Sequence, residues 1–126
     1  MTTVGIATGA GRGMGLACAR RMTEMVDVLI VVDRDEPSLL VAAKDLSDVG
    51  AAVVDPFVLD VTDGAGIDEL AARVTQLGSL RAVSHAAGIS PTMADWKQIF
   101  GVDLVGTALM AEALRPLAGA GTAMVC

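Results

Sequence analysis

Four glycines stand within eight residues near the start of the chain, at a spacing suited to binding a phosphate group. The stretch reads Thr8-Gly9-Ala10-Gly11-Arg12-Gly13-Met14-Gly15 and lies between an apolar run at 4–7 and a helical pattern. Gly9 suits a backbone conformation closed to other residues, Gly13 lets a phosphate approach, and Gly15 lets the helix pack tightly on the strand. The first amides of the helix would then face the anion. A tight turn without a ligand is the alternative.

An acidic residue follows the second predicted strand. Residues 28–32 are apolar and largely β-branched, which is typical of a strand buried on both faces, and Asp33 comes directly after them. A carboxylate there accepts hydrogen bonds from the diol of an adenosine ribose and repels a 2′-phosphate. Arg12 and Arg34 are placed where a basic residue could contact that phosphate. Because an exposed ion pair between an arginine and that phosphate contributes little, we expect NAD rather than NADP. The alternative for Asp33 is a solvated loop acid or a helix cap.

The chain has four segments that resemble, in order, the motifs of the short-chain dehydrogenase/reductase family. Thr8-Gly9-x-x-x-Gly13-x-Gly15 resembles its glycine motif, and Asp60-Val61 resembles the pair whose Asp meets the adenine amino group. His85-Ala86-Ala87-Gly88 resembles its Asn-Asn-Ala-Gly element. Val102-Asp103-Leu104-Val105-Gly106 resembles its Val-Asn-x-x-Gly segment. The resemblance covers the whole chain.

This resemblance implies which residues hold the cofactor, NAD in preference to NADP. They are Thr8, Gly9, Gly11, Arg12, Gly13, Met14, Gly15, Asp33, Arg34, Asp60, Val61, Ala86, Ala87 and Gly88. The activity it implies is hydride transfer between a nicotinamide cofactor and a carbonyl or secondary alcohol.

The sequence departs from the family at several positions. His85 and Ala86 replace two asparagines, and Asp103 replaces the helix asparagine of the active-site hydrogen-bond relay, so the relay would run only in altered form. We expect His85 to be structural rather than catalytic. The family's catalytic Ser and Tyr-x-x-x-Lys have no counterpart, since the chain has no Tyr and only Lys44 and Lys97. We therefore expect no catalytic residue here, and a chain that is a fragment or truncated product of a longer parent.

Predicted strands and helices alternate along the chain. Strands are expected at 4–7, 28–32, 52–59, 80–84 and 122–126, and helices after the glycine turn and at 37–50, 67–77 and 95–115. Pro56 places the third strand at a sheet edge or in a bulge, and Thr62 or Asp63 could cap the helix that follows. The alternation predicts an α/β fold, a Rossmann-type doubly wound parallel sheet in three layers, cut off after the start of strand five. We expect one domain, 1–126.

Composition excludes several classes of function. The chain is 53% hydrophobic and carries 9 basic against 15 acidic residues, a net charge of −6, so we expect no nucleic-acid partner. Its longest aliphatic run is too short to span a membrane, and its start does not resemble a signal peptide. We therefore expect a cytoplasmic protein with buried thiols at Cys18 and Cys126 and no metal site.

The long helix at 95–115 is apolar nearly all round, which predicts burial on every face. In the family it resembles, this helix packs on a partner subunit, so we expect a homo-oligomer formed through it, or self-association of the chain made alone. Residues 91–96 could line the rim of the site. Trp96 is either a substrate contact or, more in keeping with a helix start, a residue packed on the core.

Three functions are consistent with these observations. The first is the cofactor-binding part of an oxidoreductase that acts on small carbonyl or alcohol substrates. The second is a catalytically inactive dinucleotide-binding or dimerisation module, which the missing Tyr supports. The third is an S-adenosylmethionine-dependent methyltransferase; the glycine spacing and Ala87-Gly88 count against it.

Overall fold

Five parallel strands form the centre of the structure, a computed structural model that describes residues 1–90 and 92–126. The strands are β1 (Thr3–Thr8), β2 (Val28–Asp33), β3 (Val53–Val58), β4 (Ser79–His85) and β5 (Ala123–Val125). The helices are α1 (Gly13–Met22), α2 (Glu36–Val49), α3 (Gly64–Leu77), α4 (Trp96–Ile99), the π-helix η1 (Phe100–Gly106), α5 (Thr107–Leu114) and the 3-10 turn η2 (Arg115–Leu117).

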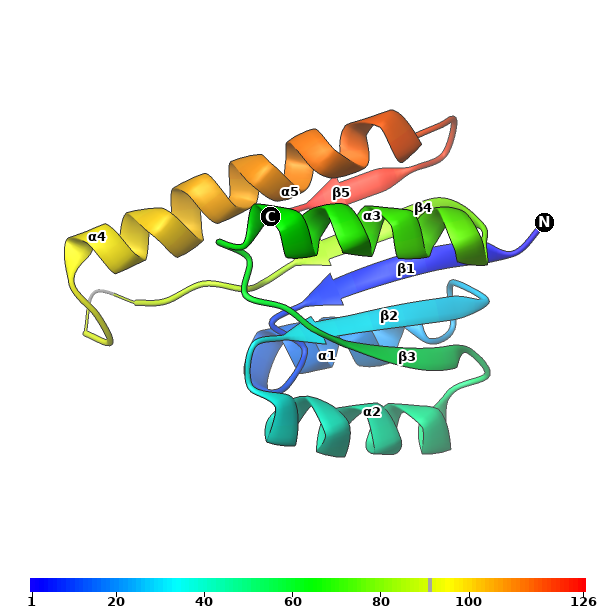
Figure 1. Ribbon diagram of the computed structural model, residues 1–126. Helices are drawn as coiled ribbons and strands as arrows, with labels where there is room; N and C mark the ends of the chain where they lie inside the picture. Colours follow the sequence, from blue (N-terminus) through cyan, green and yellow to red (C-terminus); the bar gives the residue numbers. More distant parts are fainter. Residues whose placement is uncertain (91) are drawn as a thin grey trace.

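The strand order in the sheet is β3-β2-β1-β4-β5. The chain moves outward from β1 to β3, then returns to the other side of β1, so the order reverses between β1 and β4. At this point Thr8 is in register with His85, and the two strands end together. Helices α1 and α2 cover one face of the sheet, and α3 and α5 cover the other (Figure 1). This is the three-layer doubly wound architecture expected from the sequence.

Alternate residues of the central strands point into two separate cores. On β2, Ile30 packs toward α3 and α5, whereas Leu29 and Val31 pack toward α1 and α2. A strand covered on both faces reads as a continuous apolar run, which is why residues 28–32 carry no polar side chain. The cores fix the sheet from both sides and so hold the strand ends at one edge.

Strand β3 lies at the edge of the sheet, as its proline predicts. It pairs with β2 alone, with Pro56 opposite Val31. An edge strand tolerates the missing amide of proline because that side of the strand needs no partner. Asp63 is the residue that caps α3, since its Oδ1 accepts a hydrogen bond from the amide of Gly66 at 3.2 Å.

The long helix expected at 95–115 is present, but its middle is wound as the π-helix η1. Its outer side is uncovered: Leu104 is 61% exposed, and Phe100 and Val105 are also exposed. Within the described part of this chain no element covers these side chains, and burial of this face by a partner subunit stays a prediction. Within residues 1–90 and 92–126, no helix reaches the length and apolar character that crossing a bilayer demands.

Two expectations about side-chain burial are wrong. Trp96 does not pack on the core; it is 64% exposed and meets Phe100 edge to face, with ring centroids 6.0 Å apart. Of the two thiols, Cys126 is exposed and Cys18 only half-buried. Both errors have one physical cause, because an apolar side chain is buried only where another element covers it.

Adjacent leucines in α2 provide a test of this core. Leu39 is fully buried, whereas Leu40 is 50% exposed. We predict that Leu39→Ala lowers the free energy of unfolding by about 2–5 kcal/mol, because it leaves a cavity under the sheet. The control, Leu40→Ala, changes it by about 0.5 kcal/mol or less. Urea unfolding followed by circular dichroism measures both, and equal effects would contradict this placement of α2.

Candidate functional site

The turn after β1 requires glycine at three positions: Gly9, Gly13 and Gly15. Gly9 and Gly13 have φ of +64° and +60°, where a side chain is strained. A Cβ on Gly15 would lie 2.0 Å from the carbonyl oxygen of Gly9, so only glycine lets α1 begin so close to β1. A Cβ on Gly13 would meet nothing within 4 Å. Gly13 therefore borders open space at the start of α1.

The N-terminus of α1 is suited to receive an anion. Its N-cap residue Arg12 makes no side-chain cap, and its first turn contains no acidic residue. The first amides of a helix have no partner within the helix and carry a partial positive charge. Together with the open space at Gly13, they fit a phosphate group.

Asp33 is tied directly to the glycine turn. One carboxylate oxygen accepts a hydrogen bond from the amide of Gly11 at 2.9 Å, and the other accepts one from the amide of Asp35 at 3.0 Å. A Cβ on Gly11 would lie 2.8 Å from the Asp33 carboxylate. Each oxygen keeps a further lone pair, so the carboxylate is oriented and still able to accept from a ribose diol.

Arg12 is already paired with a carboxylate. Its Nη2 lies 2.9 Å from Oδ2 of Asp35, which Ser38 also contacts. The arginine is placed beside the turn as expected, but the neighbouring Asp35 offsets its charge. This weakens its value as a partner for a 2′-phosphate.

A pocket lies against Asp33 on the side of β4. It is lined by Gly9, Val32, Asp33, Arg34, Leu59, Asp60, Val61, Ala87, Gly88, Ile89 and Val102. Apolar walls with a few carboxylates at the rim suit a flat heterocycle joined to a sugar. The pocket therefore brings together the ends of β2, β3 and β4 with one residue of η1.

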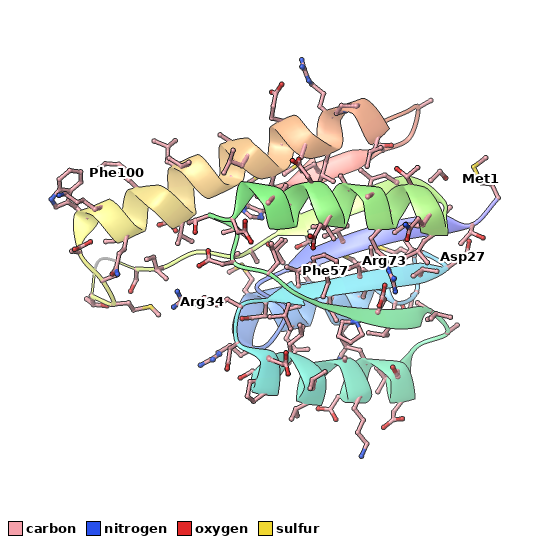
Figure 2. All side chains as sticks on the ribbon, viewed as in Figure 1. Met1, Asp27, Arg34, Phe57, Arg73 and Phe100 are labelled. Carbon is pink, nitrogen blue, oxygen red and sulfur yellow. The ribbon has the colours of Figure 1, made fainter. Side chains whose placement is uncertain are left out.

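Asp60 is held ionised at the rim of this pocket. The amide and the hydroxyl of Thr62 donate to its Oδ1 at 2.9 and 2.7 Å. These two bonds hold the pKa of Asp60 below its usual value, partial burial opposes them, and the charge of Arg34 acts in the same direction as the bonds. Arg34 extends from the end of β2 at this edge of the molecule (Figure 2).

The side chain of Thr8 makes its hydrogen bonds within the protein. Its side chain is fully buried, and its hydroxyl oxygen accepts from the amide of Ala87 at 3.1 Å and lies 2.8 Å from Nδ1 of His85. The hydroxyl thus ties the end of β1 to the loop after β4. It positions Ala87 and Gly88, which line the pocket. That Thr8 also contacts the cofactor stays a prediction.

A second pocket lies beyond this loop. It is lined by Met14, Cys18, Ser84, His85, Ala86, Ala87, Gly88, Ile89, Asp103, Thr107, Val125 and Cys126. Oδ1 of Asp103 accepts from the amide of Ile89 at 2.9 Å. The buried Nε2 of His85 has no hydrogen-bond partner among the described residues. Met14 and Ala86 face this pocket and not the one beside Asp33.

The predicted residues are thus found in the two pockets and in the glycine turn. Residues Thr8, Gly11, Arg12, Gly13 and Gly15 line neither pocket and belong to the turn; the others line one pocket or both. Sequence reasoning missed Ile89, which lines both, and Thr62, which orients Asp60. The signal for Ile89 is its position directly after Gly88. The signal for Thr62 is a hydroxyl two residues after Asp60, the acidic residue that follows β3. The predicted rim segment begins at Pro91, which lies outside the described residues; Met93 and Ala94 line a neighbouring pocket with Arg34. In residues 1–90 and 92–126, no cluster of His, Cys, Asp or Glu could hold a metal ion.

A parallel sheet with a glycine turn and a strand-end carboxylate at its switch point defines a Rossmann-type nucleotide-binding fold. Known proteins with similar sequences agree with this assignment. A family model described as enoyl-(acyl carrier protein) reductase matches residues 9–126. Galactitol 2-dehydrogenase (L-tagatose-forming) of Cereibacter sphaeroides is 33% identical over 106 residues, which cover 79% of this chain and 41% of that protein.

Solved structures match as well. A short-chain dehydrogenase/reductase from Burkholderia phymatum in complex with NAD is 28% identical, with a TM-score of 0.77 over 92% of this chain and 44% of that one. An actinorhodin polyketide ketoreductase with NADPH is 26% identical, with a TM-score of 0.79 over 90% of this chain and 46% of that one. The chain spans between 41% and 52% of the length of the curated relatives it matches.

The chain belongs to the short-chain dehydrogenase/reductase family of oxidoreductases. The resemblance seen in the sequence is confirmed, and the methyltransferase alternative is wrong.

The buried His85 makes the stability of this site depend on pH. Burial lowers the pKa of His85 from the usual 6.5, so the unfolded chain takes up the proton first. Well above pH 6.5 His85 is neutral in both states and contributes no pH dependence to the free energy of unfolding. We predict that the free energy of unfolding falls as the pH drops from 6.5, and that His85→Asn reduces this slope. Urea unfolding at several pH values between about 5 and 7 measures it, before carboxylates titrate. Equal slopes for both proteins would contradict the prediction.

Proposed function

We propose that this chain binds the adenosine and pyrophosphate part of NAD for an oxidoreductase. One observation carries the proposal: the carboxylate of Asp33 is held by the amide of Gly11, within the turn whose open glycine and uncapped helix fit a phosphate. A ribose acceptor and a phosphate site are thereby joined in one rigid unit, the arrangement a dinucleotide needs.

The residues assigned to the cofactor follow from this arrangement. Gly9, Gly11, Gly13 and Gly15 shape the turn, Asp33 holds the ribose, Asp60 and Val61 border the adenine, and Ala87 and Gly88 form the loop that the dinucleotide crosses. Arg34, Met14 and Ala86 line one or the other of the two pockets, Arg12 lies beside the glycine turn, and Thr8 positions the loop. We take residues 1–126 as one cofactor-binding domain.

When bound, the nicotinamide group would supply a site that accepts or donates hydride. The whole protein is proposed to move that hydride between the cofactor and a small carbonyl or secondary alcohol. The residues of this chain bind and orient the cofactor; we assign none of them to proton transfer, because the chain has no Tyr.

The preference for NAD over NADP is testable at Asp33. We predict that Asp33→Asn weakens NAD binding by about tenfold and narrows the gap to NADP, because the like charges of carboxylate and 2′-phosphate no longer repel. Asparagine keeps one acceptor oxygen for the Gly11 amide. Calorimetric titration with both dinucleotides measures the effect, and Asp45→Asn on the exposed face of α2 is the matched control. A preference for NADP in the unaltered chain would contradict the assignment.

We also propose that the chain forms a homo-oligomer through α4, η1 and α5 and that it acts in the cytoplasm. The exposed apolar side chains of this helix support the first point, with Phe100 projecting from its end in Figure 2. The two free cysteines support the second.

A charge on this helix should abolish self-association. We predict that Leu104→Glu converts oligomers into monomers, because the carboxylate would lose its hydration in an apolar interface. Sedimentation velocity measures the change. Val41→Glu, at a position that is likewise exposed but lies on α2, is the control and should leave the oligomer intact. A monomeric unaltered chain, or dissociation by the control, would contradict the proposal.

A further inference from the structure

Residues Ala87, Gly88 and Ile89 form the boundary between the two pockets of the site. All three line the pocket of Asp33 and Asp60, and all three also line the second pocket. A ligand whose ribose is held at Asp33 and whose far end is long enough to pass this boundary enters the second pocket. For a dinucleotide that far end is the nicotinamide.

Asp103 is the charged group beside this boundary. Its Oδ1 accepts the hydrogen bond from the amide of Ile89 at 2.9 Å, and a Cβ on Gly88 would lie 3.2 Å from the same oxygen. Its other oxygen makes no hydrogen bond among the described residues, so the carboxylate is fixed by one oxygen and leaves the second for the pocket.

No positive charge balances Asp103 there. Among the described residues that line the second pocket, none is Arg or Lys. The remaining base is His85, and burial lowers its pKa, so it is neutral near pH 7. Among the side chains of the described residues that line the second pocket, Asp103 is therefore the charged one, and it stands where the family's segment has an uncharged amide.

We propose that Asp103 makes the site select the oxidised over the reduced form of the nicotinamide dinucleotide. The two forms share their adenosine and pyrophosphate and differ in the nicotinamide ring, which is cationic when oxidised and neutral when reduced. A fixed carboxylate near that end attracts the first and gains nothing from the second. The inference rests on the proposed function, since it concerns the same dinucleotide at the same site.

Tighter binding of the oxidised form has a chemical consequence. It lowers the reduction potential of the bound couple relative to the free one, because the bound oxidised form is the one stabilised. Asp103 would therefore oppose hydride transfer to the bound oxidised cofactor and favour donation from the reduced one. It is a specificity-determining residue, and no proton transfer is assigned to it.

The experiment compares affinities and needs no catalysis. NAD⁺, NADH and ADP-ribose are titrated calorimetrically into the chain and into Asp103→Asn, which keeps an acceptor oxygen for the Ile89 amide. We expect the unaltered chain to prefer NAD⁺ and the variant to lose about twofold to fivefold of that preference, the range of an exposed ion pair. ADP-ribose, which lacks the nicotinamide, should bind both equally. Raising the salt should shrink the preference of the unaltered chain only.

The outcomes separate this inference from the function on which it rests. If none of the three ligands binds, the proposed function fails and the inference falls with it. If all bind but the ratio of NAD⁺ to NADH affinity is the same in both proteins, the inference alone is overturned. An equal change in ADP-ribose affinity also overturns it, since Asp103 would then act through the loop. Asp45→Asn, the same chemical change on α2, should alter no affinity.

Discussion

The site depends on a place where three backbone segments approach too closely for side chains. At the end of β1, a Cβ on Gly15 would lie 2.0 Å from the carbonyl oxygen of Gly9, and a Cβ on Gly9 would lie 2.9 Å from the backbone of Ala86. The start of α1, the turn and the loop after β4 therefore meet within contact distance. Packing this close is what brings helix amides, a strand-end carboxylate and a crossing loop to one edge of the sheet.

Two polar side chains at this crossing, those of Thr8 and Asp33, are paired within the protein and hold the geometry without a ligand. The hydroxyl of Thr8 bridges His85 and the amide of Ala87, and the carboxylate of Asp33 takes the amide of Gly11. Buried polar groups left without partners are costly, so these bonds select one arrangement of the loops. Carboxylates border both pockets, so attraction for a dinucleotide's phosphates must come mainly from backbone amides and the helix dipole.

The sequence predicted the layers, the edge position of β3 and the residues that gather at the strand ends. These follow from local rules: apolar runs define strands, Pro56 excludes a central position, and the glycine spacing fits one turn. Burial was predicted less well, as Trp96 and Cys126 show. Whether a side chain is covered depends on elements distant in sequence. The pairing of Arg12 with Asp35 is also a tertiary contact between residues far apart in the sequence, which motif spacing does not encode.

The π-helix η1 was beyond local reasoning, and it connects the two halves of the site. A π-helix offsets the side chains that follow it, and such segments are frequent at functional sites. Val102 lines the pocket of Asp33, and the next residue, Asp103, lines the second pocket. A Cβ on Gly106 would lie 2.9 Å from the side chain of Val61, so the segment is pressed against the wall of the first pocket. Because one wide turn supplies both Val102 and Asp103, a shift of η1 that opens the pocket of Asp33 must also move the carboxylate that borders the second pocket.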